Sequence, residues 1–562
     1  MAARTLILRS FSARHGPVVI GLAGLLGLHV WWLAQFRADG FREYDEAGYL
    51  SIALRNTHAF EDGGLPVGLR MAVSENVQAP LVPTLAVPAL ILADGRTSAA
   101  WSVQLLSLVI LTLAAAAVAR RCCPGRWPLL AAGVVATLPS VTDYARLFHF
   151  ALPATALLMM ATLAVLDSDG LLSRRHAILA GFLLGLMTLT RTMTLGYIPG
   201  LGCAALLLAV ACRGERRRRL TNWLLIVGTT AATASLWYLP HARSVGAYLL
   251  GSGYGSDSAE FGSSQPFSPA ALLDTCRVVL GALRLPLAVG LGLAAIVGAA
   301  VVVKHVPPWR RAITSNQAVL LLVVAEGILV LVSTPNEGTA FELPFIPHII
   351  VLAVSGLAVA PRVPGRLVGG ILAAASLAGL LASSALVPGL RPLIVAVPGA
   401  GAIRVLDPRG VIHSEAEPLG DTSHGRKLPS QVQATRAFAD EVALTVISRA
   451  DEHNVALRLI DAAGDPLLNS TRYRLAAREL ARRELVVRSF HPRDSGDSIT
   501  AMAAQMRTTA APFIITGEPR GEAAFGIVQT DVEQAVLQAG YRSFRTLEAD
   551  DGRLFRLWEF SG

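Results

Sequence analysis

Long apolar runs separated by short charged loops fill roughly the first two thirds of the chain. The first run, residues 17–36, holds about 20 residues, enough at about 1.5 Å per residue to cross a ~30 Å hydrocarbon core. Further runs lie at residues 98–118, 127–142, 149–166, 177–195, 197–212, 220–240, 278–303, 316–334, 344–360 and 367–387. The pattern predicts about eleven membrane-spanning helices.

The first run has some features of a signal peptide, because Arg4, Arg9 and Arg14 precede it. No small-residue cleavage site follows it, and Trp31 and Trp32 stand near its far end, where aromatic side chains anchor a helix at the membrane interface. We therefore interpret it as a retained membrane helix that follows a cytoplasmic N-terminus.

Basic and acidic residues fall on opposite sides of the predicted membrane. The loops assigned to the cytoplasm carry Arg120, Arg121, Arg126, Arg213, Arg216 to Arg219, Lys304, Arg310, Arg311, Arg362 and Arg366. The loops assigned to the outside carry Asp39, Glu43, Asp45, Glu46, Glu61, Asp62, Glu75, Glu337 and Glu342. This asymmetry obeys the positive-inside rule, and an odd number of spans places the C-terminus outside. The net charge of +9 therefore reflects membrane topology and does not indicate a nucleic-acid partner.

Two outer loops are long enough to carry function. The first, residues 37–97, includes Pro80–Ala93, an apolar stretch too short to span and interrupted by prolines, which predicts a re-entrant or interfacial segment. The second, residues 241–277, is rich in Gly and Ser and predicts a flexible loop.

Beyond Pro388 the chain has the composition of a soluble domain. Helical patterns at 431–442 and 473–484 alternate with predicted strands at 485–490 and 512–516, and residues 547–559 predict a hairpin that turns at Asp550, Asp551 and Gly552. None of the common hydrolase, metalloprotease or nucleotide-binding motifs occurs there. We predict a small extracytoplasmic α/β domain over residues 388–562.

Composition supports a membrane protein over a soluble one. Hydrophobic residues make up 53% of the chain and charged residues only 16%, against about 25% in soluble domains. The five cysteines lie in or beside apolar runs without zinc-site spacing, which argues against disulfides and structural zinc. The predicted fold is an α-helical polytopic membrane domain, residues 1–387, followed by the α/β domain.

The candidate chemistry is concentrated just after the first span, at Glu43 to Tyr49. Two adjacent carboxylates, Asp45 and Glu46, are costly to desolvate beside a hydrocarbon boundary, so their position there calls for a reason. One of them could remove a proton from an acceptor hydroxyl while a lipid-held donor reacts beside it. The simpler alternative is that both are solvated loop residues.

Further segments resemble those of the GT-C membrane glycosyltransferases, the superfamily of the protein O-mannosyltransferases and the lipid A aminoarabinose transferase. The similar segments occur in the same order, over about residues 15–360: Asp45-Glu46, Gln78 to Leu81, Asp94 to Ser98, Arg120-Arg121, Leu138 to Arg146, Gly185 to Arg191, Trp237 to Pro240 with Gly253 to Gly255, and Glu342 to Pro347. Each segment alone is a weak signal, and their order makes the set moderately specific.

The resemblance implies that a sugar moves from a polyprenyl phosphate to an acceptor at the outer membrane face, with inversion at the anomeric carbon. It implies that Asp45 is the general base and that Glu46 orients it or a loop. Arg191, Arg243 and His241 become candidates for contact with the donor phosphate. Their simpler alternative role is to anchor helix ends at the interface by reaching toward water.

The chain also departs from the family pattern. Ala151 stands where relatives often have a second acid, and Asp143 or His149 is a possible substitute. Tyr49 and Arg146 are further supporting candidates. In the proline segment the acid of the aminoarabinose-transferase relatives is missing, and Glu75 lies slightly upstream, which leaves a divalent-metal requirement open. Late in the chain, Glu342 stands where an arginine is common, so the usual phosphate contact does not carry over to it.

Two other classes of function remain open. A lipid or solute transporter would need ionisable groups near the membrane midplane, and Glu326 is the candidate for such a group. A non-catalytic scaffold would bind envelope glycans through the C-terminal domain. In every case the predicted location is a bacterial inner or plasma membrane. The partners under the enzyme reading are a polyprenyl-phosphate sugar and a glycan, lipid or protein acceptor.

Overall fold

The computed structural model describes most of the chain. The described residues are 20–35, 44–75, 77–212, 214–255, 265–304, 314–335, 340–384, 386–387, 390, 392–397, 401–406, 429–463, 470–490, 498–517, 529–549 and 552–561. They form two compact units: unit 1 is Met1–Trp32, Ala72–Leu85 and Trp101–Ile412, and unit 2 is Leu33–Met71, Ala86–Ala100 and His413–Gly562. Both units combine stretches that are distant in the sequence.

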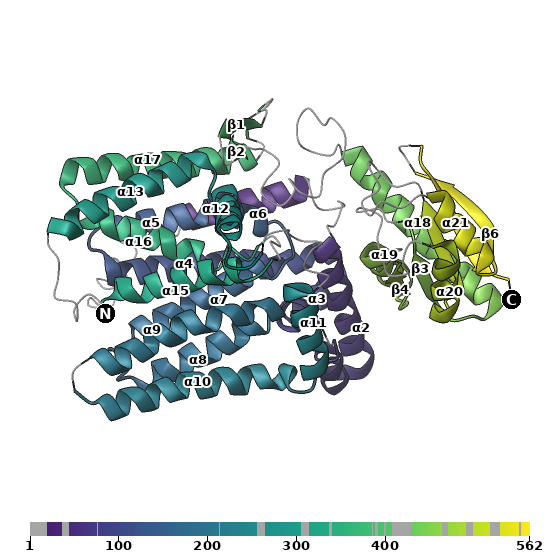
Figure 1. The fold of residues 1–562 in the computed structure, drawn as a ribbon, viewed down its shortest axis with the longest axis horizontal. Coiled ribbons are helices and arrows are strands. Elements are labelled where there is room, and N and C mark those ends of the chain that lie inside the picture. The colour runs from purple at the N-terminus through teal and green to yellow at the C-terminus, as the bar shows by residue number, and fades with distance from the viewer. Residues whose placement is uncertain are drawn as a thin grey trace, which may run out of the picture. The chain divides into compact units, whose positions relative to one another are not determined.

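Unit 1 is a bundle of apolar helices (Figure 1). Its elements are α4 (Trp101–Cys122), α5 (Trp127–Ala136), α6 (Pro139–Tyr144), α7 (Ala151–Leu166), α8 (Arg174–Thr188), the 3-10 helix η2 (Thr192–Tyr197), α9 (Ile198–Ala211), α10 (Arg216–Tyr238), α11 (Ala242–Tyr254), α12 (Pro269–Leu283), α13 (Leu285–Lys304), α15 (Asn316–Ser333), α16 (Ile346–Val359) and α17 (Arg362–Ser383). The apolar helix Ile20–Gln35 corresponds to the first predicted span.

Several of these helices are long and apolar enough to cross a membrane. Among the described residues, Thr97–Cys122, Thr192–Ala211, Asn316–Ser333 and Arg362–Ser383 qualify singly, and the bent pair Pro269–Leu283 and Leu285–Ala300 would supply another span. Shorter apolar helices are Ile20–Gln35, Leu81–Leu92, Trp127–Ala136, Ala151–Leu166 and Ile346–Val359. The prediction of a polytopic helical protein is supported, whereas the count of about eleven spans stays a prediction.

Two runs expected to form single spans are broken. The run at 127–142 divides into α5 and α6, because Leu138 has extended backbone angles and Pro139 starts a new helix. The run at 278–303 divides at Arg284, whose φ of +65° ends α12, and α13 leaves at 108° to it. Hydrophobicity alone does not reveal such turns, because both sides of each break are apolar.

Two segments within the predicted outer loops are helical; whether the first is re-entrant or interfacial stays a prediction. The stretch 80–93 contains the continuous helix α3 (Leu81–Leu92), with Pro88 inside it, so the prolines do not break it. The first part of the Gly/Ser-rich stretch 241–277 is α11, which corrects the prediction of a flexible loop there. Gly262 lies outside the described residues.

Small residues let α8 and α10 pack closely, as the two adjacent ribbons in Figure 1 show. A Cβ at Gly181 would overlap Thr229 Oγ1 and the Ile226 carbonyl, and one at Gly185 would lie 2.5 Å from Thr233 Cβ. Glycines at these points bring the two backbones together, which is a common way to pack helices where lipid gives no hydrophobic drive for association.

In unit 2 the first outer loop forms a folded-back helix. α2 (Tyr44–Ala72) is interrupted at Gly64, where φ is +67° and the backbone is not helical. Beyond the interruption, Gly68 packs so closely on the Phe60 ring that a Cβ would overlap it, and Arg55 donates to the Met71 carbonyl at 3.3 Å. The Gly63-Gly64 pair therefore turns the chain back along its own first arm.

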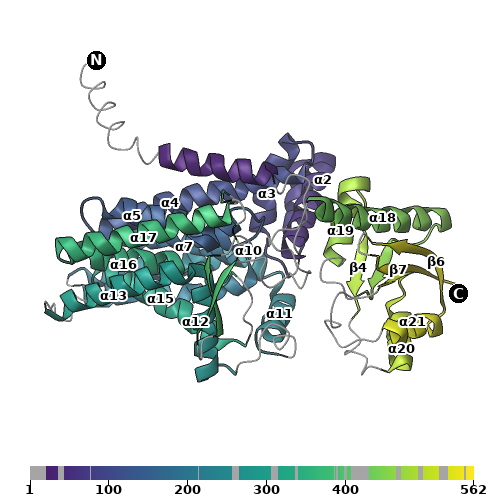
Figure 2. The ribbon, with the colours of Figure 1, turned by 90° about the horizontal axis from the view of Figure 1, so that it is seen from above.

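The rest of unit 2 is an α/β fold with a five-stranded mixed sheet ordered β4-β3-β5-β7-β6. The strands are β3 (Arg458–Asp461), β4 (Val486–Ser489), β5 (Phe513–Gly517), β6 (Tyr541–Glu548) and β7 (Leu554–Phe560). The helices are α18 (Pro429–His453), α19 (Ser470–Ala481), α20 (Ile499–Thr509) and α21 (Gln529–Gln538). Figure 2 shows α18 and α19 on one side of this sheet and α20 and α21 on the other.

Burial on both faces explains the composition of the central strand. In β5, Phe513 and Ile515 belong to the core under α18 and α19, whereas Ile514 between them belongs to the core under α20 and α21. An unbroken apolar run is typical of a strand covered on both sides. The strands predicted at 485–490 and 512–516 are confirmed, and β6 and β7 form the predicted hairpin, although Asp550 and Asp551 lie outside the described residues.

A separate two-stranded ribbon follows the helices of unit 1. β1 (Leu393–Val397) and β2 (Gly401–Leu406) pair antiparallel and belong to the same compact unit as the bundle. The described chain therefore does not divide into compact units at residue 387, and the 1–387 and 388–562 domains stay a prediction.

The α8–α10 contact predicts opposite effects for two glycine substitutions. Gly181→Ala should lower the thermal unfolding midpoint in detergent, because its Cβ meets the α10 backbone and overpacking costs about 1–3 kcal/mol. Gly228→Ala, which faces open space on α10, should leave the midpoint unchanged or raise it slightly through helix propensity. Equal effects of the two substitutions would contradict the close packing.

Asp440 on α18 predicts a pH-dependent stability. Burial raises the pKa of its carboxyl to about 6, with Arg436 opposing the rise and Glu479 adding to it. The folded state then binds the proton more tightly than the unfolded state. The contribution of protonated Asp440 to the free energy of unfolding is therefore complete below about pH 4 and is lost as the pH rises through about 6. Asp440→Asn should raise the thermal midpoint at pH 8 and weaken its dependence between pH 4 and 7. An unchanged pH dependence would contradict this assignment.

Candidate functional site

The two candidate acids lie in the first turn of α2, in unit 2. Glu46 is fully buried, and Asp45 beside it is half-buried. Negative charge in the first turn of a helix is favoured by the exposed amide groups and the positive end of the helix dipole. Tyr49, one turn further on, is also fully buried, whereas Glu43 lies outside the described residues. Burial places Glu46 in an environment unlike that of a solvated loop.

Arg191 lies at the start of η2, in unit 1, and is held on two sides. Its guanidinium donates to the hydroxyl of Tyr248 on α11 at 3.2 Å, and its Cζ lies 5.4 Å from the centre of the Phe150 ring. The side chain stays partly exposed. A partly exposed guanidinium with fixed direction suits contact with a phosphate, because its N–H groups can donate to two oxygens at once.

His241 and Arg243 lie at the start of α11. The His241 ring shares a 2.9 Å hydrogen bond with the Trp237 carbonyl and lies at 5.4 Å from the Trp237 ring. Trp237 donates from Nε1 to the backbone carbonyl of Glu75 at 2.7 Å, which joins α10 to the segment of the first outer loop that follows α2, within unit 1. Arg243 is exposed. These contacts restrict the His241 ring, whereas the Arg243 side chain is exposed to solvent.

The segment between α6 and α7 buries the candidates for a substitute acid site. His149 is 4% exposed, and its ring lies between Tyr144, at 5.3 Å, and Phe150, at 4.3 Å. Ala151 is fully buried at the first position of α7, and Asp143 on α6 is half-buried. His149 therefore packs as one of a row of rings, and its backbone carbonyl accepts a hydrogen bond from the Gln104 side chain at 2.8 Å.

Arg146 has the contacts of a structural clamp. It is 2% exposed and donates to His29 Nδ1 at 3.2 Å, to the Ser383 carbonyl at 2.8 Å and to Ser384 Oγ at 2.6 Å. Its Cζ also lies 4.4 Å from the centre of the Trp32 ring. One guanidinium, in the turn after α6, thus connects the first apolar helix to the end of α17. Its hydrogen bonds offset much of the free-energy cost of burying the charge.

Glu342 and Glu326 lie in different parts of the bundle. Glu342 is 2% exposed, and the carbonyl of the preceding Phe341 accepts a hydrogen bond from Tyr197. Glu326 on α15 is half-buried and packs against Gly200 of α9. A Cβ added at Gly200 would lie only 2.6 Å from the Cβ of Glu326. The aliphatic part of the Glu326 side chain thus packs between α9 and α15.

Phe150 brings several of these residues together in unit 1. Its ring contacts His149, the guanidinium of Arg191 and the ring of Phe341 at 5.6 Å, and Tyr248 is attached through Arg191. We call these five residues the Phe150 cluster. By this definition Arg243 and Asp143 are not members of the cluster, and Asp45, Glu46 and Tyr49 belong to unit 2.

Sequence reasoning missed Tyr248 and Phe150. Tyr248 lies in a stretch whose glycines and serines predicted a loop, and only its place seven residues after His241, two helical turns on, could have indicated a shared helix face. Phe150 reads as one of many apolar residues. Among the described residues, no group of three His, Cys, Asp or Glu side chains is placed to hold a metal ion.

Comparison with solved structures shows which fold this is. The chain is similar to ArnT from Cupriavidus metallidurans in the apo state, with a TM-score of 0.57 and 12% identity over 97% of this chain and 98% of that one. It is likewise similar to the same protein bound to undecaprenyl phosphate, with a TM-score of 0.54 and 13% identity over the same shares. No family model and no curated protein sequence matches the chain.

These likenesses cover nearly the whole chain and therefore concern its complete architecture. The predicted GT-C resemblance is confirmed at the level of the fold. Together with the apolar helices, this fold identifies an integral membrane protein.

Substitutions of two arginines should affect stability differently. Arg146→Ala should lower the free energy of unfolding by about 2–4 kcal/mol, because it removes charge-assisted bonds from buried partners. Arg191→Ala, at a partly exposed guanidinium, should change the thermal midpoint little. A comparison of both variants by thermal unfolding in the same detergent measures the difference. Equal loss from both would contradict the assignment of Arg146 as the clamp.

Proposed function

We propose that the chain is a glycosyltransferase that moves a sugar from a polyprenyl-phosphate donor to an acceptor hydroxyl at the outer face of the membrane, with inversion. The observation that carries this proposal is the ArnT fold over 97% of the chain, seen also in a structure that holds undecaprenyl phosphate. The proposal places the N-terminus in the cytoplasm and the C-terminal α/β domain outside a bacterial inner or plasma membrane.

Asp45 is the proposed general base. Its half-buried carboxylate can meet an incoming acceptor, whereas the fully buried Glu46 cannot reach solvent and is better suited to orient its neighbour. Asp45 takes the proton of the acceptor hydroxyl as that oxygen bonds to the anomeric carbon. The bond between this carbon and the phosphate oxygen breaks, and the polyprenyl phosphate leaves with the electron pair. Attack from the face opposite the leaving group inverts the configuration.

Arg191 is the proposed contact for the leaving phosphate. Negative charge grows on the phosphate as the sugar departs, and a guanidinium aimed at it stabilises that charge. The Tyr248 hydroxyl and the Phe150 ring restrict the direction of Arg191 before the donor binds, so less ordering remains to be done on binding. His241 and Arg243 remain secondary candidates at the start of α11.

The second acid of the family pattern has no equivalent in this proposal. The methyl group of the buried Ala151 has no proton to accept or donate, and His149 is packed between two rings. We infer that one carboxylate suffices, since a phosphate leaving group needs no protonation by a general acid. The sugar, the polyprenol, the acceptor and any divalent-metal requirement are left open.

Asp45→Asn tests the proposal directly. The substitution keeps the size of the side chain but removes the proton acceptor, so transfer should fall by about 10²–10⁴-fold. Release of polyprenyl phosphate from a panel of polyprenyl-phosphate hexoses and pentoses measures the rate. Asp62→Asn, at an exposed acid of the same helix, is the matched control and should keep full activity.

Full activity of a folded Asp45→Asn protein would reject the base. No release from any donor by the unsubstituted protein, together with movement of labelled lipid across vesicles, would favour a transporter instead.

A further inference from the structure

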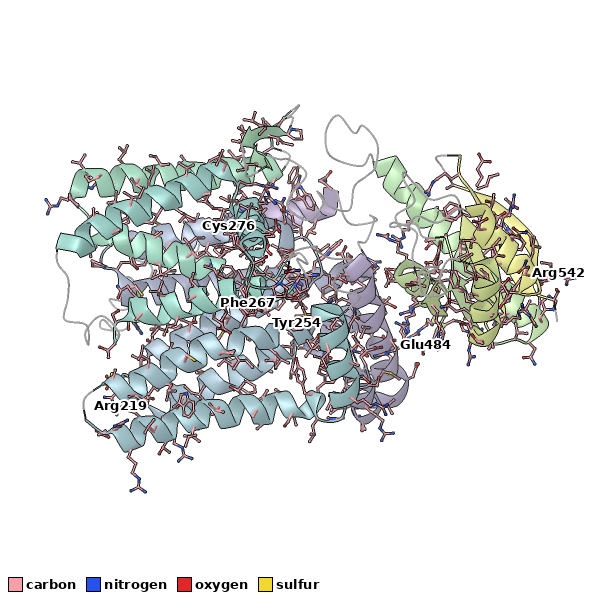
Figure 3. All side chains as sticks on the ribbon, in the orientation of Figure 1. Arg219, Tyr254, Phe267, Cys276, Glu484 and Arg542 are labelled. Carbon is pink, nitrogen blue, oxygen red and sulfur yellow. The ribbon has the colours of Figure 1, made fainter. Side chains whose placement is uncertain are left out.

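α2 is held by a helix of the C-terminal part of the chain, and both lie in unit 2. Arg478 on α19 donates from one nitrogen to the Ser51 carbonyl at 2.7 Å and to the Ser51 hydroxyl. Its other terminal nitrogen donates to Glu484 at 3.3 Å (Figure 3 labels Glu484). The Arg478 side chain is only 9% exposed. Because charge-assisted hydrogen bonds of a nearly buried guanidinium are strong and directional, the contact restricts the distance between the two helices.

A second pair extends this contact along α2. Arg482, just beyond the end of α19, pairs with Glu61, ten residues after Ser51. This pair is more exposed, with 56% of the Arg482 side chain open to solvent. Because exposed ion pairs contribute little to stability, Arg478 provides most of the attachment between α19 and α2. The Arg482–Glu61 pair adds a second point that aligns the two helices.

The attachment lies close to the proposed base. Ser51 follows Asp45 by six residues, or about 9 Å along a helix axis. The helix is continuous from its start to Gly64, so its first arm moves as one body. Successive residues turn by about 100°, so Ser51 and Asp45 are about 120° apart around the axis. The Arg478 contact therefore does not cover the Asp45 side chain but sets where the helix that carries it stands.

We propose that Arg478, supported by Arg482, is a positioning residue through which the C-terminal α/β domain sets the place of Asp45. This inference rests on the proposed function. A misplacement of about 1 Å at a reacting group can reduce turnover about 10²-fold, so a mobile α2 would slow the chemical step while leaving donor binding largely intact. The domain thereby has a role in the reaction besides any contact with the acceptor.

The chain offers a matched control in the neighbouring residue Arg483. The Arg483 side chain pairs with Asp451 inside the C-terminal α/β fold, at 3.1 Å, and not with a residue of α2. Arg483→Ala therefore removes a similar charge and ion pair two residues after the end of α19. Any effect shared by Arg478→Ala and Arg483→Ala reflects the stability of the domain alone.

Two measurements on the full-length protein test the proposal. Arg478→Ala should lower kcat about 10–100-fold with the KM for the donor changed less than threefold, and hydrogen exchange of residues 44–54 should become faster. Arg478→Lys, which can still donate to the Ser51 carbonyl, should restore most of kcat. Arg483→Ala should leave both kcat and this exchange unchanged. If Arg478→Ala is not recovered folded, Ser51→Ala removes the hydroxyl acceptor and should give a smaller loss of the same kind.

The two readouts separate this inference from the proposed function. Exchange in residues 44–54 that is no faster in Arg478→Ala than in Arg483→Ala overturns the positioning role, whatever the enzyme does. Faster exchange combined with an unchanged kcat also overturns it. A fully active Asp45→Asn protein, by contrast, rejects the base and leaves the exchange result for Arg478 standing as a structural contact.

Discussion

Charge removed from water needs partners, and this requirement governs where the polar residues of this chain can lie. Glu46 and Arg146 are almost completely buried, and each is compensated in a different way. Arg146 donates to acceptors on two segments distant in sequence, His29 on the first apolar helix and Ser383 and Ser384 at the end of α17, so it holds these parts of the bundle together. Glu46 stands in the first turn of α2, where free amide groups and the helix dipole favour a negative charge. The position of a charged residue in the fold, more than its type, therefore decides whether it stabilises the structure or is available for a reaction.

The sequence was sufficient for features that depend on periodicity and composition. The polytopic helical architecture, the buried strand at Phe513 to Gly517 and the final hairpin follow from apolar runs and turn residues. It was insufficient where local geometry overrides hydrophobicity. Arg284 and Leu138 break apolar runs through backbone angles, and a run of glycines and serines proved compatible with the helix α11. Asp45 was proposed because adjacent carboxylates beside a hydrocarbon boundary are costly to desolvate, and Arg191 because its segment resembles one of the GT-C transferases. Tyr248 was missed because its partner is 57 residues away.

The fold gives the proposed chemistry a physical setting. Unit 1 supplies a guanidinium held by a ring and a hydroxyl in the Phe150 cluster, and unit 2 supplies an acid on a helix anchored by the C-terminal α/β fold. The first arrangement suits a departing phosphate and the second suits proton removal from an alcohol. The small residues between α8 and α10 keep the bundle close-packed, which favours fixed positions for such groups.

The central proposal is that a polyprenyl phosphate binds with its phosphate against the Arg191 guanidinium. Electron cryomicroscopy of the protein reconstituted with undecaprenyl phosphate tests it most directly. We predict headgroup density within hydrogen-bonding distance of the Arg191 guanidinium. Headgroup density elsewhere on the protein, out of reach of Arg191, would contradict the account.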